Sequence, residues 1–306
     1  MDYDVLIVGA GTAGLSAALT LGRCRRRVLV ADGGPPRNAP SPAVHNYFSR
    51  DGIRPAELLR LGREQLAPYP TVAVHELRIT GLTPLAGGGF RAEGHNGHGH
   101  GWHGTTRRVL LATGVDDQLP PLPGMREYWG TGVLHCPYCH GYEVRDQPLA
   151  VYGRGRGVVG LALLLRNWSH HVAVVTDGPG HLTQHARQRL RRHHIALHEQ
   201  PVSALVGDAA TGLLRCVQFA DGTFYECAAL FLHAPQQQRS ELATALGAHH
   251  NSKGAVWVDK NMQTSTPGLY AAGDTTPGQQ QALIAAAKGN QAGICMNEAL
   301  TRAESK

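Results

Sequence analysis

The chain has 306 residues, of which 42% are hydrophobic and 17% are charged. These fractions are typical of a globular protein in solution, and the length predicts two domains. No apolar run approaches the ~20 residues of a transmembrane helix, and the start, Met1–Asp4, lacks the basic region of a signal peptide. We therefore expect a cytoplasmic protein that does not bind a membrane.

The formal net charge of +6 owes much to arginine. Two clusters, Arg23–Arg27 and Arg187–Arg192, lie near the ends of predicted helices, where positive charge suits the helix dipole. Docking of an acidic partner is the alternative interpretation of these clusters. No nucleic-acid motif and no interleaved aromatic residues accompany them, so we predict no binding of nucleic acid.

The first thirty residues predict a strand, a helix and a second strand. Apolar runs cover Asp4–Val8 and Arg27–Ala31, and helix-like sequence covers Thr12–Leu21. Such a βαβ unit is the building block of a parallel, doubly wound sheet.

The turn after the first strand reads Gly9-Ala10-Gly11-Thr12-Ala13-Gly14. In a dinucleotide-binding turn the first glycine allows the tight bend, the second lets a pyrophosphate approach the backbone, and the third lets helix and strand pack closely. The phosphates then lie on free N–H groups at the helix N-terminus. Asp32 ends the next strand, where an acid accepts a hydrogen bond from a ribose 2′-OH. Together these features predict a dinucleotide site.

The six cysteines are too few for a secreted disulfide framework in a chain of this length. Four of them are isolated in the sequence, and we expect them to be small buried side chains: Cys24, Cys216, Cys227 and Cys295.

The other two form Cys136-Pro137-Tyr138-Cys139. This spacing suits the first turn of a helix, where the dipole lowers a thiol pKa, and Pro137 suits that turn because it lacks only an N–H that would be unpaired. A metal site needs further ligands at suitable spacing; His135 and His140 flank the pair, but no second Cys-x-x-Cys exists, so we predict no metal. A structural disulfide gains little from so short a loop. The pair is therefore predicted to be redox-active.

A second βαβ unit follows the cysteines. It consists of a strand at Pro148–Tyr152, a helix around Val158–Asn167 and a strand at Val172–Thr176. The last part of the chain contains a short strand near Leu269–Ala272 and a long helical stretch, Gln279–Arg302. This helix cannot bury its apolar face alone, so we expect it to return to the first domain.

Turn-rich sequence marks the joints at Thr113–Gly124 and Ala234–Gln238. The predicted fold is α/β, with two Rossmann-like doubly wound domains, the second inserted into the first. The first domain is predicted at 1–115 plus 240–306, and the inserted domain, which carries the cysteine pair, at 116–239.

A further motif lies near the C-terminus. The run Thr266–Asp274 places a carboxylate at the end of a strand and directly before a helix. Two-domain flavoproteins use such an aspartate to bind the ribityl chain of FAD. With Gly9–Gly14, Leu111–Gly114 and Cys136–Cys139 it follows the order and spacing of the low-molecular-weight thioredoxin reductases, which the chain resembles over almost its whole length.

Two segments resemble a divergent branch of that family. They are Cys136–Glu143, which reads Cys-Pro-Tyr-Cys-His-Gly-Tyr-Glu, and His45-Asn46. The branch includes thioredoxin-reductase-like proteins of bacteria and dithiol oxidases that close disulfides in natural products.

The resemblance implies non-covalently bound FAD, a homodimer, and a thioredoxin-like protein or a small dithiol or disulfide as partner. It also implies which residues bind the cofactor, with Asn46 and Gln281 near the flavin ring. The predicted cofactor residues are Gly9, Gly11, Thr12, Ala13, Gly14, Asp32, Asn46, Thr113, Gly114, Gly273, Asp274, Gln281 and Ala282.

By the same resemblance, Cys139 faces the flavin and Cys136 exchanges with the substrate. A proton must move to or from the outer thiol, which requires a group that titrates near neutrality. Thioredoxin reductases generally have an aspartate directly after the second cysteine, whereas this chain has His140, which we predict to be the acid–base residue. A packing role is the alternative for His140, and Glu143 is a weaker candidate for orienting the imidazole or sharing the proton.

The second glycine turn departs from a pyridine-nucleotide site. In Gly153–Val158, Val158 stands where a glycine or alanine normally permits close packing. NADPH-dependent members carry a His-Arg-Arg-x-x-x-Arg run after the next strand, but Thr176–Leu182 has no arginine, and Asp177 would repel a 2′-phosphate. NADPH is therefore not expected. NADH stays open, because Asp177 could accept a 2′-OH and the arginines of the turn could contact phosphate.

Three functions remain at this point. The first is a thioredoxin-reductase-like enzyme whose electrons come from a small acidic carrier such as ferredoxin. The second is a dithiol oxidase that forms a disulfide in a small molecule and passes electrons to O2. The third is a flavin-binding regulator without turnover, against which the intact cysteine pair argues, because a redundant dithiol near a flavin is an oxidative liability.

Overall fold

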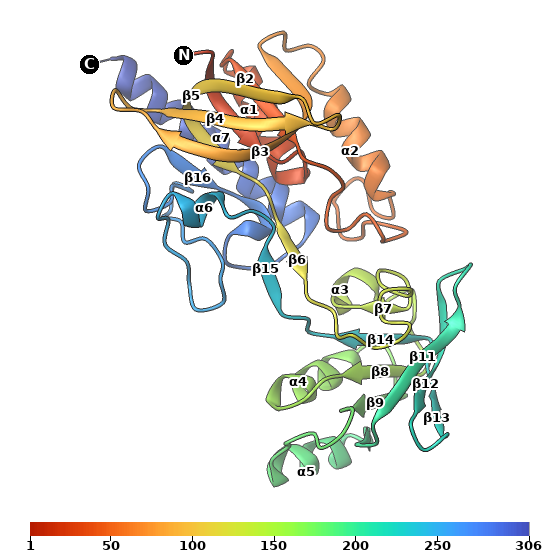
Figure 1. The fold of residues 1–306 in the computed structure, drawn as a ribbon. Coiled ribbons are helices and arrows are strands. Elements are labelled where there is room, and N and C mark those ends of the chain that lie inside the picture. Colours follow the sequence, from red (N-terminus) through yellow and green to blue (C-terminus); the bar gives the residue numbers. More distant parts are fainter. Residues whose placement is uncertain (306) are drawn as a thin grey trace. The chain divides into compact units, whose positions relative to one another are not determined.

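The computed structural model describes residues 1–305 and divides into two compact units (Figure 1). Of the described residues, the first unit comprises 1–39, 47–116 and 236–305, and the second comprises 40–46 and 117–235. Both are α/β units built on parallel sheets, and the second is inserted into the first, as the sequence predicts. Residues 40–46 lie with the second unit, a placement that no feature of their sequence predicted.

The first unit is built on a sheet whose central strands are parallel and buried on both faces. Strands of this kind are almost continuously apolar, which explains the apolar runs at the start of the chain. The parallel order is β3 (Val72–Pro84), β2 (Val28–Asp32), β1 (Tyr3–Val8), β5 (Gly101–Leu111) and β16 (Leu269–Ala271). In Figure 1, β4 (Phe90–Asn96) lies between β3 and β5 and runs antiparallel to both.

Helices cover this sheet. One apolar cluster lies between the sheet and two long helices, and a second lies on the other face, beside β4 and the short α6. The bounds of the helices are α1 (Thr12–Arg23), α2 (Pro55–Glu64), α6 (Leu242–Ala245), the 3-10 turn η1 (Gly273–Thr275) and α7 (Ala282–Glu304).

Helix α7 is the predicted long C-terminal helix, and it packs on α1 in the first unit. Glycine makes the close approach possible: a Cβ added to Gly289 would lie 2.0 Å from the carbonyl oxygen of Ala13. The predicted return of the C-terminal helix to the first unit is thus observed.

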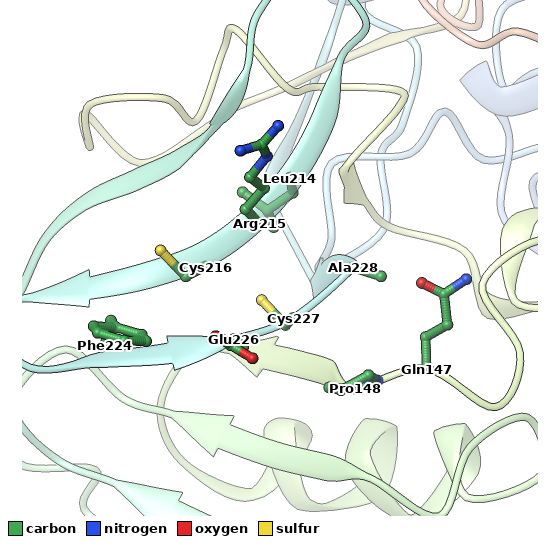
Figure 2. Close-up of a pocket in the computed structure, with 9 residues that line it drawn as sticks. All are labelled: Gln147, Pro148, Leu214, Arg215, Cys216, Phe224, Glu226, Cys227 and Ala228. Carbon is green, nitrogen blue, oxygen red and sulfur yellow. The ribbon is translucent and has the colours of Figure 1, made fainter.

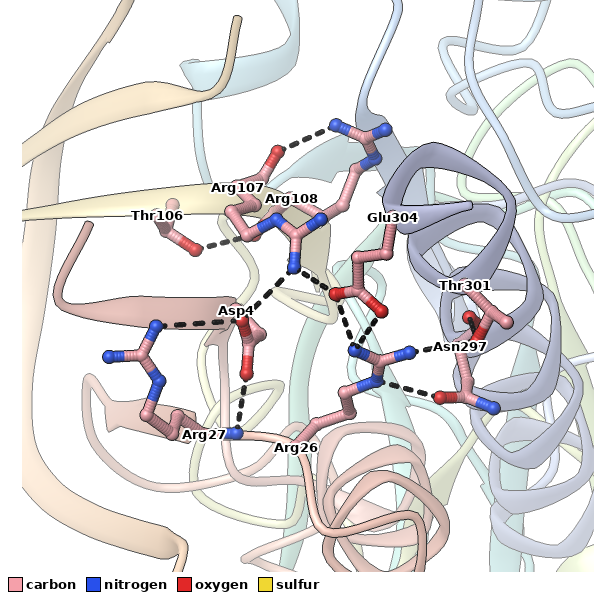
Figure 3. Close-up of polar contacts among 9 residues, drawn as sticks. All are labelled: Asp4, Arg26, Arg27, Thr106, Arg107, Arg108, Asn297, Thr301 and Glu304. Atoms are coloured by element: carbon pink, nitrogen blue, oxygen red, sulfur yellow. Dashed lines mark hydrogen bonds and ion pairs between the residues drawn. The ribbon is translucent and has the colours of Figure 1, made fainter. Parts of the chain in front are cut away.

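Ion pairs hold the end of α7 to the start of the chain (Figure 3). Glu304 accepts from Arg26 at 2.7 Å and also from Arg107, which in turn reaches Asp4 at 3.4 Å. Arg26 follows the C-terminus of α1. Arg26, a member of the first arginine cluster, therefore forms an intramolecular ion pair in addition to lying near the C-terminus of a helix.

Two short strands join the units. They are β6 (Val115–Asp117) and β15 (Gln236–Gln238), which form a two-stranded ladder. Arg239 follows β15 and donates to the carboxylate of Asp116 at 2.6 Å, which adds an ion pair to the ladder.

The second unit contains an all-parallel sheet with helices on one face and a small antiparallel sheet on the other. The parallel order is β10 (Ala196–His198), β9 (Val172–Val175), β8 (Leu149–Tyr152), β14 (Ala229–Leu232) and β7 (Val133–Leu134). The helices are α3 (Pro137–His140), α4 (Arg156–Leu165) and α5 (Gln184–Arg192), and the antiparallel strands are β11 (Val202–Asp208), β12 (Leu213–Phe219) and β13 (Phe224–Glu226).

The isolated cysteines correct one prediction. Cys227 is buried and Cys216 and Cys295 are partly buried, but Cys24 is exposed. The prediction that all four are buried is therefore wrong for Cys24, because this residue caps the C-terminus of α1 rather than lying on its apolar face. Among residues 1–305, no helix combines the length and apolarity needed to cross a bilayer.

Candidate functional site

Most of the predicted cofactor residues meet at one edge of the first unit's sheet. Val8 at the end of β1 pairs with Ala31 of β2 and with Leu111 of β5, and Leu111 pairs with Ala271 of β16. Because these strands are parallel, the residues that follow them lie together beyond their carboxyl ends, which is where α/β sheets bind ligands. This edge carries Asp32, Gly9–Gly14, Thr113, Gly114, Gly273 and Asp274.

The glycines of the first turn have different surroundings. A Cβ on Gly9 would lie 2.3 Å from the carbonyl oxygen of Ala112, and one on Gly14 would lie 1.9 Å from the carbonyl oxygen of Gly9. A Cβ on Gly11 would meet no atom within 4 Å. Gly11 is the N-cap of α1 and brings no side-chain cap, so the first N–H groups of the helix are available to a ligand. The turn is thus tightly packed at Gly9 and Gly14 and open at Gly11, and this open space beside free N–H groups fits a pyrophosphate.

Asp32 is held by a neighbour that the sequence did not indicate. Its carboxylate accepts from the N–H of Gly34 at 3.2 Å and from Arg63 Nη2 at 2.6 Å. Arg63 lies in the last turn of α2. Carboxylate oxygens have further lone pairs, so Asp32 can still accept a hydrogen bond from a ribose hydroxyl.

Asp274 has a similar unpredicted partner. Arg37 Nη1, in the loop after β2, lies 3.0 Å from Asp274 Oδ2 and 2.8 Å from Gln280 Oε1. The resemblance that marked Asp274 gave no signal for Arg37, because the two residues are distant in sequence.

Thr275 joins two of the predicted segments. Its Oγ1 accepts from the N–H of Gly114 at 2.8 Å and lies 3.3 Å from Oγ1 of Thr113. Gln281 is the N-cap of α7 and Ala282 its first residue, and α7 packs against η1. The N-terminus of α7 therefore reaches the same edge.

Asn46 is the exception among the predicted cofactor residues. It belongs to the second unit, and its Nδ2 donates to the carbonyl oxygen of Tyr138 at 2.6 Å. Its φ of 58° is in the left-handed region, where asparagine is tolerated better than most residues. The structure thus places Asn46 beside the cysteine pair.

Cys136 and Cys139 are joined by a disulfide at the start of α3. Cys136 is the N-cap and Pro137 the first helical residue, as the spacing predicts. The carbonyl oxygen of Cys136 accepts from the N–H groups of Cys139 at 3.1 Å and His140 at 3.2 Å. Both cysteines are partly exposed, so the disulfide is accessible to a reaction partner.

His140 is the last residue of α3, directly after Cys139, and it is half-buried. Its Nε2 is 2.9 Å from Ser41 Oγ, and its Nδ1 is buried without a hydrogen-bond partner among residues 1–305. Burial lowers its pKa; the negative charge of Glu143 opposes this effect and the nearby His45 adds to it. The imidazole is therefore mainly neutral at neutral pH.

Glu143 is placed next to a different histidine. Its Oε1 is 3.3 Å from His45 Nε2. Glu143 therefore acts on His140 through its charge, and the hydroxyl that contacts the His140 ring belongs to Ser41. Ser41 was missed by the sequence analysis, because no motif marks it.

The second glycine turn is closed by its own chain. The N–H of Gly155, the N-cap of α4, donates to the carbonyl oxygen of Gly180 at 3.0 Å. Arg154 Nε donates to the carbonyl oxygen of Thr176 at 2.9 Å, and its Nη2 donates to that of Asp177. The loop after β9 is thus bonded to the turn at which a pyrophosphate would bind.

Asp177 is also engaged within the protein. Its Oδ1 accepts from the N–H of Val202 at 2.8 Å and its Oδ2 from the hydroxyl of Tyr152 at 2.9 Å. Burial and the Asp177 carboxylate raise the pKa of Tyr152 to about 12, so this hydroxyl keeps its proton. Val158 is buried in the core of the second unit.

A cavity of about 340 Å³ in the second unit lies elsewhere (Figure 2). It opens beside β12, β13 and the start of β8, and it contains no predicted site residue. Burial raises the pKa of its Cys227 to about 12, so this thiol is not a nucleophile at neutral pH. No cluster of His, Cys, Asp or Glu in the described part of the chain is arranged to hold a metal ion.

Two Rossmann-like units, a pyrophosphate cradle in the first and a disulfide at a helix N-terminus in the second define a disulfide oxidoreductase of the two-domain flavoprotein type. Residues 3–289 match the family model described as pyridine nucleotide-disulphide oxidoreductase. The chain therefore belongs to this family of enzymes, which implies FAD and a nicotinamide cofactor.

Individual relatives place the chain among the thioredoxin-reductase-like members. A solved structure described as a putative thioredoxin reductase TrxB from Bacillus anthracis has 32% identity and a TM-score of 0.91, covering 98% of this chain and 99% of that one. The structure of HlmI has 37% identity and a TM-score of 0.89, with coverage of 99% and 94%. Thioredoxin reductase tcpT of Claviceps purpurea is 31% identical over 280 residues, covering 89% of this chain and 86% of that protein.

Proposed function

We propose that the protein passes electrons between FAD and a protein or small-molecule disulfide through Cys136 and Cys139, and that it does so without NADPH. The observation that carries the proposal is the contrast between an open first glycine turn and a second one closed by its own loop. The accessible disulfide at the start of α3 supplies the exchange site.

The first unit fits FAD. The N–H groups around Gly11 would hold the pyrophosphate, Asp32 the ribose and Asp274 the ribityl chain. When bound, FAD supplies a two-electron donor or acceptor. Non-covalent binding is part of the proposal, because the cradle consists of backbone N–H groups and carboxylates.

In the second unit, the groups that would bind NADPH already form hydrogen bonds within the protein. Gly155 has donated its N–H to the loop after β9, and both oxygens of Asp177 accept bonds from the protein. The Arg154 guanidinium is bound to two backbone carbonyls, so it is already occupied where it would otherwise meet a phosphate. NADH faces the same closed turn, although it lacks the 2′-phosphate that Asp177 repels.

The partners follow from this assignment. The names of the relatives favour a thioredoxin-like protein or small disulfide on the side of the cysteines. On the other side, an acidic carrier such as ferredoxin would make the protein a reductase, and O2 would make it a dithiol oxidase. We also propose the cytoplasmic homodimer that the family resemblance implies. The proposed FAD-binding domain is 1–115 and 240–306 and the proposed inserted domain is 116–239, except that residues 40–46 group with the second unit and 116 and 236–239 with the first.

The decisive experiment is anaerobic titration of the FAD-loaded protein, followed at the flavin absorption band. Bleaching by dithiols but not by NADPH is the expected result, and bleaching by micromolar NADPH would overturn the proposal. Repeated reoxidation in air after dithiol bleaching would identify the oxidase. Bleaching by reduced ferredoxin, with slow reoxidation in air, would identify the reductase, and no bleaching by any donor would leave the flavin-binding regulator.

Replacement of the inner cysteine tests the role of the pair. Cys139→Ser should abolish bleaching by dithiols and leave the bound FAD and its absorbance unchanged, because the cradle lies in the first unit. Cys24→Ser, which removes an exposed thiol far along the chain from the pair, is the matched control and should behave like the wild type. Loss of FAD from Cys139→Ser would show instead that the disulfide is structural.

A further inference from the structure

The hydrogen bonds around Ser41 determine which nitrogen of His140 carries the hydrogen. Ser41 Oγ donates its single hydrogen to the carbonyl oxygen of Ala43 at 2.7 Å. In the 2.9 Å contact with His140 Nε2, the serine oxygen must therefore accept, and the imidazole must donate. A neutral imidazole has only one N–H, so its Nδ1 carries a lone pair.

The position of Ser41 is fixed by its own segment. It lies between Pro40 and Pro42, whose rings restrict the backbone, and Pro40 packs on Gly130, where an added Cβ would come within 2.8 Å of the proline ring. The segment belongs to the second unit, together with the disulfide. Ser41 is thus a preset acceptor for the ring of His140.

Other groups near the imidazole do not replace this contact. Glu143 and His45 act on His140 through charge and lie 3.3 Å from one another. No partner for Nδ1 exists among residues 1–305, although the atom is buried. An unpaired buried nitrogen lowers the stability of the fold, so its presence needs an explanation, and a role in proton transfer is one.

We propose that Ser41 is a positioning residue that holds neutral His140 in the Nε2–H tautomer, so that Nδ1 is the base for thiol–disulfide exchange at Cys136–Cys139. The inference rests on the proposed function, because it deepens the role of the same site. A serine hydroxyl that both donates to a fixed carbonyl and accepts from the ring performs the task that carboxylates and carbonyls perform for other catalytic histidines.

The exchange step balances as follows when a substrate dithiol is oxidised. Nδ1 is buried in the structure, so the substrate must first uncover it; one substrate thiol then loses its proton to Nδ1, and its sulfur attacks Sγ of Cys136. The new sulfur–sulfur bond forms as the Cys136–Cys139 bond breaks, and Cys139 leaves as a thiolate. The second substrate thiol then displaces Cys136 and its proton passes to the departing Cys136 sulfur, so the substrate disulfide is released while the proton on Nδ1 balances the charge of the Cys139 thiolate. In the direction of disulfide reduction the same steps run in reverse, and His140 returns the proton to the departing thiol.

The tautomer can be measured directly on the FAD-loaded protein. With isotope-labelled histidine, the ring nitrogen signals distinguish Nε2–H from Nδ1–H, and the signals missing from a His140→Gln variant identify His140. The expected result is Nε2–H in the wild type and a mixture of tautomers in Ser41→Ala. An Nδ1–H ring in the wild type would overturn the inference.

The kinetic test uses the rate at which dithiothreitol bleaches the flavin without oxygen, measured across neutral pH. Ser41→Ala should slow this rate about tenfold, less than the hundredfold or more expected for removal of a general base. Its pH profile should also move to lower pH, because the protonated ring loses the acceptor of its Nε2–H. Ser41→Thr keeps the hydroxyl and should restore both the rate and the profile.

A matched control is available in the same unit. Ser203 also donates to a backbone carbonyl, that of Gln218, and does not contact His140. Ser203→Ala should leave rate and pH profile unchanged. If Ser41→Ala bleaches like the wild type with the same profile, the inference fails while the proposed function stands. If the wild type shows no bleaching by dithiols, the proposed function fails, and the tautomer measurement still decides the role of Ser41.

Discussion

The two glycine turns of this protein begin from the same pattern of strand, glycines and helix. In each, the first glycine has a positive φ, 111° at Gly9 and 141° at Gly153, and the second glycine caps a helix. The caps then differ: Gly11 has φ −72°, whereas Gly155 has φ 74°. The first turn packs on the backbone of Ala112 and keeps an open centre, while the second bonds to the loop after β9.

This difference shows that a glycine pattern defines a possible site but not its availability. The first turn is surrounded by the residues that follow β5 and β16, which lie beyond the carboxyl ends of the parallel strands, where α/β sheets bind ligands. At the second turn, Gly180 and Arg154 provide hydrogen bonds that a ligand would otherwise make. A bound nucleotide would have to replace these internal bonds, which reduces its net gain in free energy.

The largest expected effect is a loss of FAD affinity when one methyl group is added to the first turn. Gly14→Ala should lower FAD affinity at least tenfold, because its Cβ would lie 1.9 Å from the carbonyl oxygen of Gly9 and would displace the turn. Gly157→Ala is the control in the second turn, where an added Cβ meets no atom within 4 Å. Gly157→Ala should keep FAD and stabilise α4 by up to about 1 kcal/mol. The ratio of flavin to protein absorbance after gel filtration measures retention, and equal retention in both variants would remove the distinction between the turns.

A smaller effect is expected from the acids that follow the corresponding strands. Asp32→Ala should weaken FAD binding about tenfold, since a hydrogen bond to a charged group contributes about 1.5 kcal/mol at the lower end of its range. Asp177→Ala should leave FAD binding unchanged and reduce the free energy of unfolding by about 1–3 kcal/mol, because Tyr152 and the N–H of Val202 lose their acceptor. Fluorescence titration with FAD and urea unfolding measure the two quantities. A loss of FAD affinity in Asp177→Ala would contradict a purely internal role for this acid.

The smallest effect concerns pH and the loop that closes the second turn. The Arg187 side chain and the N–H of Gly180 hydrogen-bond to Glu199 and lower its pKa from 4.5 to about 2. A depressed carboxylate pKa stabilises the fold above the unfolded value, and this stabilisation is lost as the pH falls from about 4.5 towards 2. In Glu199→Gln the acid-dependent fall in Tm over this range should be about 1–2 °C smaller than in the wild type. Identical slopes in the two proteins would show that the pair does not hold the loop.

Local patterns in the sequence were sufficient to predict both βαβ units and the position of the cysteines. Helix α4 begins two residues before the predicted start, and the strands of both units lie within one or two residues of their predicted bounds. These features depend on residues that are close in the chain, such as Pro137 at the first position of α3. The late helix returned to the first unit because its apolar face requires a partner.

Only the tertiary structure decided which partners hydrogen-bond to the polar side chains on these elements. Ser41 meets His140 across 99 residues, Arg37 meets Asp274 across 237, and Asp177 meets Val202 across 25. Each contact is one hydrogen bond or ion pair, between two side chains or, for Asp177, between a side chain and the backbone N–H of Val202, and it leaves no periodic signal in either segment. The sequence by itself predicted a dinucleotide-binding turn and a redox-active cysteine pair at the start of a helix. Which turn is open, and which nitrogen of His140 is free, depends on hydrogen bonds that form only when distant segments are brought together by folding.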